Sequence, residues 1–226
     1  MMKPGNIAIF AGTLPIVSVF TAYAIAVSQG HVPDCLPLFE GCTTISSTGR
    51  QGPERLFFLA TMIPSAMLMM LYWFLMRQWL RRIQHGRLRE IGVIFLLGMT
   101  SAVFLIVYTV ALGFIDPAYA IQRRIGVTLF FSCSLVAQLM VSNLVFKLVK
   151  AGVLSIPCGL HYYLAGICGL MLLTGLITIP VSIYVSNGYI AENIIEWNYA
   201  VIMYLFYVVT GVIWRVTGYR LSFHTD

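Results

Sequence analysis

The chain has 226 residues, of which 59% are hydrophobic and only 10% are charged, and its formal net charge is +6. Soluble globular domains carry about 25% charged residues, so this composition excludes a soluble domain. It favours one membrane domain covering residues 1–226. The positive charge alone would also fit a nucleic-acid-binding protein, and the distribution of the charges along the chain decides between these two readings.

Six long apolar runs separate the clusters of charged residues. We expect transmembrane spans near residues 7–28, 56–76, 91–114, 125–146, 160–185 and 197–214. These runs are close to the ~20 residues that a helix needs to cross about 30 Å of hydrocarbon. They lack the two-residue alternation of a membrane-spanning β-strand and are about twice as long as such a strand. The sequence therefore predicts an all-α integral membrane bundle of six transmembrane helices.

The basic residues indicate the orientation of this bundle, because short basic loops resist translocation and remain in the cytoplasm. Ten of the 14 basic residues fall on one side of the predicted spans: Lys3, Arg77, Arg81, Arg82, Arg87, Arg89, Lys147, Lys150, Arg215 and Arg220. The other side carries six of the eight acidic residues. We therefore expect both termini in the cytoplasm. The net charge is then a topology signal, and no nucleic-acid partner is needed to explain it.

The predicted inner side has two further features. Five aromatic residues fall near the inner ends of spans, where aromatic side chains form belts at the membrane interface: Trp73, Trp79, Tyr162, Tyr163 and Trp214. The basic loop from Arg77 to Arg89 is a candidate site for anionic lipid headgroups or for a membrane-protein partner.

The longest loop, residues 29–55, lies on the predicted outer side and contains Cys35 and Cys42. These two cysteines face a compartment that permits disulfides, whereas the others fall within the spans or at an inner span end. Their spacing is compatible with a short loop closed by a disulfide, but it does not establish the distance between their Cα atoms. A Cys35–Cys42 bridge and two free thiols both remain open.

Signatures of catalysis are scarce. The sequence contains no hydrolase, metal-binding, phosphate-loop or dinucleotide motif, so we expect no metal and no cofactor. His31 and Asp34 share the outer loop with Ser46 and Ser47, which leaves a hydrolytic arrangement open. Solvated loop residues are the more frequent explanation of such a set, and the sequence favours a non-catalytic protein.

Polar residues gather where the second, fourth and sixth spans begin on the outer side. Helix N-termini present unpaired backbone amides, and together with arginines they bind phosphate groups readily. We therefore predict a site for an anionic lipid headgroup formed by Ser46, Ser47, Thr48, Gly49, Arg50, Glu54, Arg55, Arg123, Arg124, Glu196 and Trp197. In the alternative interpretation, the four arginines pair with outer acidic residues and only tie the loops together: Glu54, Asp116, Glu192 and Glu196.

Three short segments resemble a known family of membrane proteins. They are Ile-Ser-Ser-Thr-Gly at 45–49 followed by Pro-Glu at 53–54, Arg-Ile-Gly at 124–126, and Ala191 followed by Glu-Trp at 196–197. Together with the six-span plan they are similar to the damage-regulated autophagy modulator, FGF-receptor-activating protein and suppressor-of-four-kinase family. The post-GPI-attachment lipid-remodelling factor and the N-terminal domain of the calcofluor-white-hypersensitive protein are related to it. Ser47 stands where many members have Asp, and Arg124 stands where many have His.

This resemblance implies a multi-pass membrane protein linked to lipid remodelling, lipid asymmetry or membrane signalling. It implies a eukaryotic plasma, Golgi or lysosomal membrane, and the sequence alone also permits a bacterial inner membrane. We predict a lipid-handling protein that recognises an anionic headgroup at the outer leaflet, with membrane lipids as its partners. An intramembrane lipid-modifying enzyme and a non-catalytic scaffold that binds another membrane protein or a second copy of itself are the alternatives.

Overall fold

The computed structural model describes residues 3–84, 86–114, 116–157, 159–184 and 188–220, and all of its regular elements in these ranges are helices. Six helices are long and apolar enough to cross a membrane: α1 (Pro4–Ser28), α4 (Gly52–Ile83), α5 (Leu88–Ala111), α6 (Pro117–Lys150), α7 (Leu160–Tyr184) and α8 (Gly188–Val216). Two four-residue helices, α2 (Pro37–Glu40) and α3 (Ile45–Thr48), lie in the connection between α1 and α4. The all-α class with six candidate spans is confirmed.

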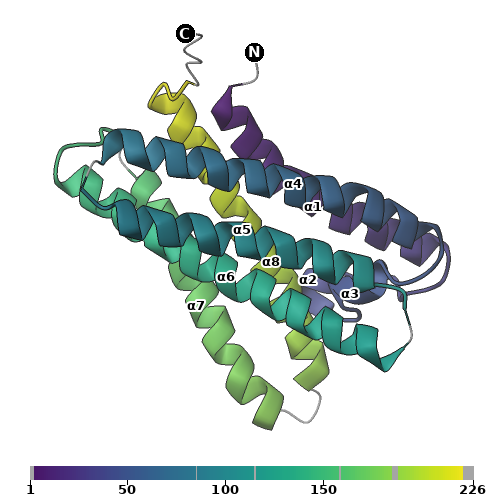
Figure 1. Cartoon of the computed structure of the whole chain (residues 1–226). Coiled ribbons are helices and arrows are strands. Elements are labelled where there is room, and N and C mark those ends of the chain that lie inside the picture. Colours follow the sequence, from purple (N-terminus) through teal and green to yellow (C-terminus); the bar gives the residue numbers. More distant parts are fainter. Residues whose placement is uncertain (1–2, 85, 115, 158, 185–187, 221–226) are drawn as a thin grey trace.

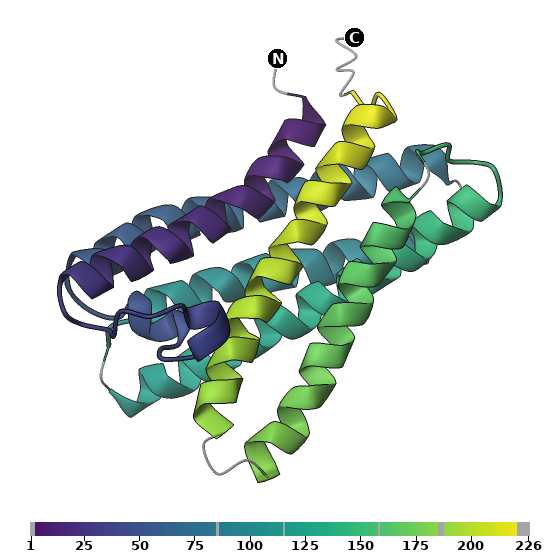
Figure 2. The same cartoon turned by 180° about the vertical axis from the view of Figure 1, so that it is seen from behind.

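The long helices form a closed ring. Each of them packs against the next along the chain from α4 to α8, and α1 closes the ring by packing against both α4 and α8. Figures 1 and 2 show the start of α1 and the end of α8 side by side, so both termini leave the bundle at the same end. We call this the inner end, after the orientation that the basic residues predict, and the end that carries α2 and α3 the outer end.

Several helices extend beyond the predicted spans. The helix α6 begins at Pro117 and α8 begins at Gly188, each about two turns before the apolar run that marked the span. Asp116 caps α6 by accepting a hydrogen bond from the Ala118 amide (2.8 Å), and the proline at the first helical position suits such a start. Hydropathy reports the lipid-covered part of a helix, whereas caps set where the helix begins. Val185, the last residue of the fifth predicted span, lies outside the described residues.

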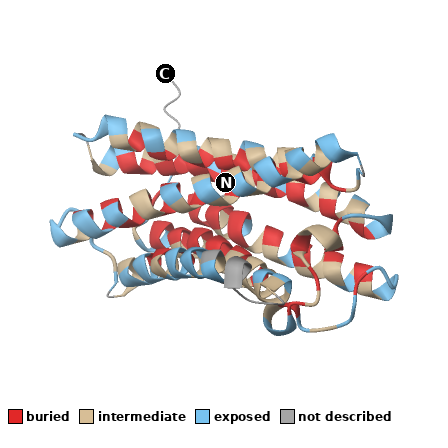
Figure 3. Cartoon of the chain, turned by 90° about the horizontal axis from the view of Figure 1, so that it is seen from below, coloured by how far each residue is buried: buried red, intermediate tan, exposed pale blue. Residues whose placement is uncertain are grey.

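The interior of the ring is filled largely by aromatic side chains. Figure 3 shows the buried residues along the faces that the helices turn toward one another. Trp73, Trp79 and Trp214 are buried there and do not face outward, whereas Tyr162 and Tyr163 at the start of α7 are exposed. Tyr72 stacks on Trp214 with ring centroids 5.3 Å apart, and its hydroxyl donates a hydrogen bond to Thr210 (3.3 Å). In a bundle without a hydrophobic driving force between helices, such packing supplies the cohesion.

Candidate functional site

The outer connection, residues 29–51, is folded as a cap against the first half of α8 (Figure 2). Three side chains of α8 donate hydrogen bonds to backbone carbonyls of this cap: Asn193 to Gly41 (2.7 Å), Trp197 to Thr43 (2.9 Å) and Asn198 to Leu38 (2.8 Å). The indole of Trp197 is fully buried. Each bond satisfies a carbonyl that has no helical or strand partner, and together they hold the cap in one place.

The helix α1 and a disulfide hold the other side of the cap. The Tyr23 hydroxyl accepts a hydrogen bond from the Cys35 amide (2.8 Å) and donates one to the Cys35 carbonyl (2.7 Å). Cys35 is joined to Cys42 by a disulfide, with their Cα atoms 6.5 Å apart. Closing this short loop restricts the unfolded chain and so stabilises the folded cap.

A buried pair joins the cap to the start of α4. The Glu54 side chain is 0% exposed, and its Oε1 lies 2.5 Å from Nδ1 of His31, whose side chain is 31% exposed. The other carboxylate oxygen of Glu54 is buried without a hydrogen-bond partner among the described residues. Gly52 packs on this pair: a Cβ there would lie 2.7 Å from Glu54 Oε2, and its φ of +60° also favours glycine.

The hydroxyl residues of the predicted site bond within the cap; Thr48 is buried, and Ser46 and Ser47 are half-buried. Thr44 caps α3, and its Oγ1 lies 2.7 Å from Oγ of Ser47 and 3.1 Å from Oγ of Ser46. Thr48 is buried and donates to the Ile45 carbonyl (2.7 Å), and Gly49 packs against the ring of Phe58. These residues shape the turn that leads to Arg50.

Arginines surround the outer end of α5. Arg55 of α4 donates through Nε to the Leu112 carbonyl (3.0 Å) and lies over the ring of Phe114 (5.0 Å). Arg123 of α6 donates through Nη1 to the Phe114 carbonyl (2.7 Å). Arg123 Nη1 also donates to the carbonyl of Ala111 (3.3 Å), the last residue of α5, and Leu112 is the C-cap residue, so both side chains offset the negative end of the helix dipole.

The arginines do not form the ion pairs that the alternative interpretation expected. Among the residues that the structure describes, the ion pairs within 4.0 Å are His31–Glu54 and Arg87–Glu90, and neither involves an outer arginine. Arg50 and Arg124 are exposed. A guanidinium group carries five N–H donors, so Arg55 and Arg123 keep donors for a further acceptor.

A small cavity of about 20 Å³ lies beneath the cap. Its walls are apolar except for Glu196, Tyr108 and Tyr204. The Glu196 carboxyl meets the backbone amide of Ile45, and Arg50 and Arg123 are near enough to Tyr108 to interact with it electrostatically. The cavity is large enough for little more than one water molecule. A ligand of lipid size would therefore rest on the outer surface of this region and not inside it.

The structure thus brings only some of the predicted residues together. Arg50, Arg55 and Arg123 gather around the end of α5, while Glu54 and Trp197 hold the cap from inside. The alternative interpretation paired Glu54 and Glu196 with the outer arginines. Glu54 instead bonds to His31, and Glu196 faces the start of α3. Residues of the cap that sequence reasoning missed are Tyr23, Asn193 and Asn198. The two asparagines flank the Glu-Trp pair on α8, which is the only signal that pointed to them.

The family relationship adds to this geometry. The model of the family described as the Frag1/DRAM/Sfk1/Cwh43P N-terminal domain matches residues 5–212, nearly the whole chain. The chain is a member of this family. Comparison with curated proteins gave no match, and neither did comparison with solved structures.

Membership agrees with the six apolar helices in making this an integral multi-pass membrane protein. The match spans all six long helices and the cap, so the segments at 45–54 and 196–197 that carried the resemblance meet within one folded region. In the described ranges, no group of three or more His, Cys, Asp or Glu side chains is arranged to hold a metal ion.

Proposed function

We propose that this Frag1/DRAM family protein recognises the anionic headgroup of a lipid at the outer leaflet. The observation that carries the proposal is the group of Arg50, Arg55 and Arg123 around the end of α5, with no carboxylate within 4.0 Å of them in the described part of the chain. A phosphate group accepts several charge-assisted hydrogen bonds at once, and the free N–H donors of these arginines supply them.

The surface beside these arginines suits a lipid. Leu56 follows Arg55 on α4 and Ile121 lies two residues before Arg123 on α6, and both are large apolar side chains with more than half of their surface exposed. Leu36, just before α2, and Phe39 on α2 are exposed elsewhere on the cap, Phe39 at 74%. Such side chains are favourable in contact with acyl chains. Arginines next to them would lie at the level of the headgroups.

The rigid cap gives this surface a fixed shape. The backbone carbonyl of Arg50 approaches Gly113 closely, as does the Arg55 side chain, so the cap and the α5–α6 connection are packed together. Donors that are already in place lose little conformational freedom when a ligand binds. Remodelling of a lipid or of a lipid anchor would require such a headgroup to be held while another component acts on it.

The test uses purified protein and native mass spectrometry of bound lipid. Arg50 belongs to the group of arginines around the end of α5, and Arg124 is the residue that follows Arg123 on α6. Both are exposed and bond to none of the described residues, so the variant Arg50→Gln/Arg124→Gln should fold normally. Each lost charge-assisted hydrogen bond costs about 1.5–3 kcal/mol, so we expect affinity for a phosphate-bearing lipid to fall at least about tenfold. The matched control, Arg81→Gln/Arg89→Gln, removes two exposed charges at the inner end. Equal lipid retention by both variants would contradict the proposal.

One observation favours a second candidate function, an intramembrane enzyme acting on lipids. Glu54 fixes the Nδ1 side of His31, which is the arrangement that orients a histidine as a general base. We propose this activity only as the alternative. It predicts turnover of a labelled lipid that His31→Ala abolishes and that Ser46→Ala or Glu196→Gln reduces. Absence of turnover with every lipid class would exclude it.

A further inference from the structure

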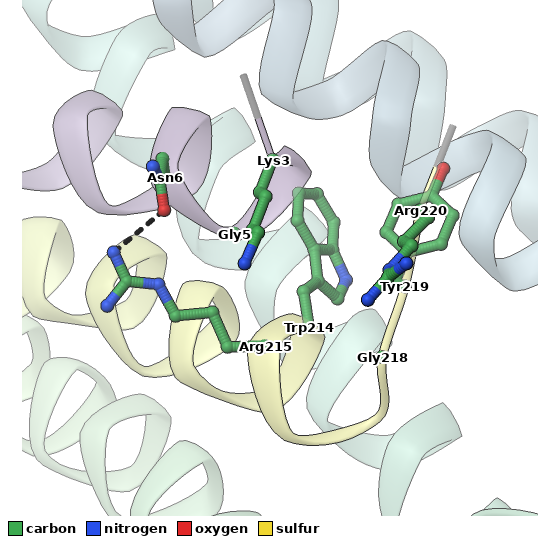
Figure 4. Close-up of a pocket in the computed structure, with 8 residues that line it drawn as sticks. All are labelled: Lys3, Gly5, Asn6, Trp214, Arg215, Gly218, Tyr219 and Arg220. Carbon is green, nitrogen blue, oxygen red and sulfur yellow. Dashed lines mark hydrogen bonds between the residues drawn. The ribbon is translucent and has the colours of Figure 1, made fainter. Parts of the chain in front are cut away.

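A second polar cavity lies at the opposite end of the bundle from the arginines around α5. It has a volume of about 450 Å³ and lies between the first turn of α1 and the end of α8. Its polar and aromatic lining consists of Lys3, Asn6, Trp214, Arg215, Tyr219 and Arg220 (Figure 4). This inner pocket plays no part in the function proposed for the outer end.

The inner pocket is strongly basic. Three of its lining side chains are cationic, and no acidic residue is among them in the described part of the chain. Arg82 of α4 adds a fourth cation at its edge, because its Nη1 donates to the Arg220 carbonyl (2.9 Å) and its guanidinium lies over the Tyr219 ring (5.6 Å). A concentration of like charges without counter-charges is unfavourable unless an anion joins it.

The pocket also contains a buried donor that lacks an acceptor. The Trp214 side chain is fully buried, and its Nε1 has no hydrogen-bond partner among the described residues. Figure 4 shows this nitrogen on the side of the indole that faces Tyr219 and Arg220. A buried N–H group without an acceptor costs about 1–3 kcal/mol, so a ligand that supplies an acceptor to Trp214 Nε1 would be favoured.

Two further features prepare the pocket for an anion. The helix α1 begins here without a side-chain cap, so the amide of Gly5 is available at the positive end of the helix dipole. Arg215 donates through Nη2 to Asn6 Oδ1 (2.8 Å), which holds the guanidinium beside the start of α1. Figure 4 shows the Lys3 side chain running toward the end of α8 next to Trp214.

We propose that the inner pocket binds a phosphate monoester or inorganic phosphate through Lys3, Arg215, Arg220 and the Trp214 indole. A headgroup of the cytoplasmic leaflet and a soluble phosphate share this chemistry. The inner end of the protein would then exist in a phosphate-bound and a phosphate-free state, independently of what binds at the outer surface.

The experiment uses the full chain in nanodiscs. Phosphatidic acid is titrated into phosphatidylcholine discs, and inorganic phosphate is titrated into the same discs without phosphatidic acid. Binding is read by tryptophan fluorescence and, independently, by native mass spectrometry. We expect a saturable fluorescence change that Trp214→Phe removes. We expect Lys3→Gln/Arg220→Gln to weaken binding at least fivefold.

The control and the two probes make the outcomes decisive. Arg81→Gln/Lys150→Gln removes two exposed charges at the same end outside the pocket and should leave binding unchanged. Saturation by phosphatidic acid alone assigns the site to a lipid headgroup, and saturation by inorganic phosphate assigns it to a soluble anion. No saturable binding of either probe overturns the proposal, as does equal weakening by both double variants. Because the outer variant Arg50→Gln/Arg124→Gln leaves the inner pocket intact, failure of one proposal is distinguishable from failure of the other.

Discussion

The His31–Glu54 pair offers a sharp test of how the cap is held, because the two single substitutions should differ in effect. His31→Ala leaves the Glu54 carboxyl buried at 0% exposure with neither oxygen bonded in the described part of the chain. Glu54→Gln replaces the same carboxyl by an amide that still reaches His31 Nδ1. The first change creates an uncompensated buried charge, and the second removes one.

The expected magnitudes follow from this difference. Removing one partner of a buried ion pair typically costs about 3–5 kcal/mol. His31 is 31% exposed, so water enters part of the space that it leaves, and we expect His31→Ala to cost roughly 2–3 kcal/mol. A neutral hydrogen bond contributes about 1 kcal/mol, so Glu54→Gln should cost about 1 kcal/mol. In the double variant the buried charge is absent, and we expect it to be more stable than His31→Ala alone.

Stability is measured by SDS titration of the protein in mixed micelles, followed by the fluorescence of the buried tryptophans. Asp34→Ala is the matched control, since it removes an exposed acidic residue of the same cap. The reasoning is refuted if adding Glu54→Gln to His31→Ala lowers stability further, because the two residues would then act independently. It is equally refuted if His31→Ala matches Asp34→Ala.

Two further predictions concern packing and the cap. Gly98→Ala places a Cβ against the buried Trp73 ring and should cost about 1–3 kcal/mol, whereas Gly166→Ala meets open space and should change stability by less than about 0.5 kcal/mol in the same titration. Reducing the Cys35–Cys42 bridge with a membrane-impermeant reductant should destabilise the cap by about 2 kcal/mol and expose two thiols to an impermeant maleimide in sealed vesicles of known orientation. Labelling of these thiols only from the side that bears the termini would contradict both the predicted orientation and the role of the cap.

Hydropathy was enough to predict the six long helices, because crossing a membrane requires a long apolar run whatever the helix packs against. It gave less information about which face of each helix is buried. Gly98 and Ala102 form a small-residue pair that lies buried against α4, as such pairs suggest. Ala165 and Gly169 have the same spacing, yet Ala165 is exposed and a Cβ at Gly169 would meet nothing. The spacing is the same in both pairs, and only the neighbouring helix distinguishes them.

Basic and acidic residues at the outer span ends predict a site there, and that site stays a prediction. The hydrogen-bond partners of its residues could not be predicted. Arg55 and Arg123, however, bond to the Leu112 and Ala111 carbonyls at the end of α5, and such unpaired carbonyls are present at the end of every helix and leave no trace in a sequence. Asn193 and Asn198 bond to carbonyls more than 150 positions away along the chain, and a single sequence carries no signal for such a contact.

The two tryptophans of α8 show that the depth of a residue in the membrane does not determine the direction in which its side chain points. Trp197 and Trp214 are 17 residues apart, which corresponds to about 26 Å along a helix and nearly matches the hydrocarbon thickness. Their depth is therefore that of interfacial residues, as the sequence suggested for Trp214. Both nevertheless point into the protein: Trp197 donates to the cap, and Trp214 packs against Tyr219, with ring centroids 5.4 Å apart. One helix thus connects the interior of the cap with the lining of the inner pocket. A substitution that rotates α8 should disturb both ends together, whereas surface substitutions at either end should not.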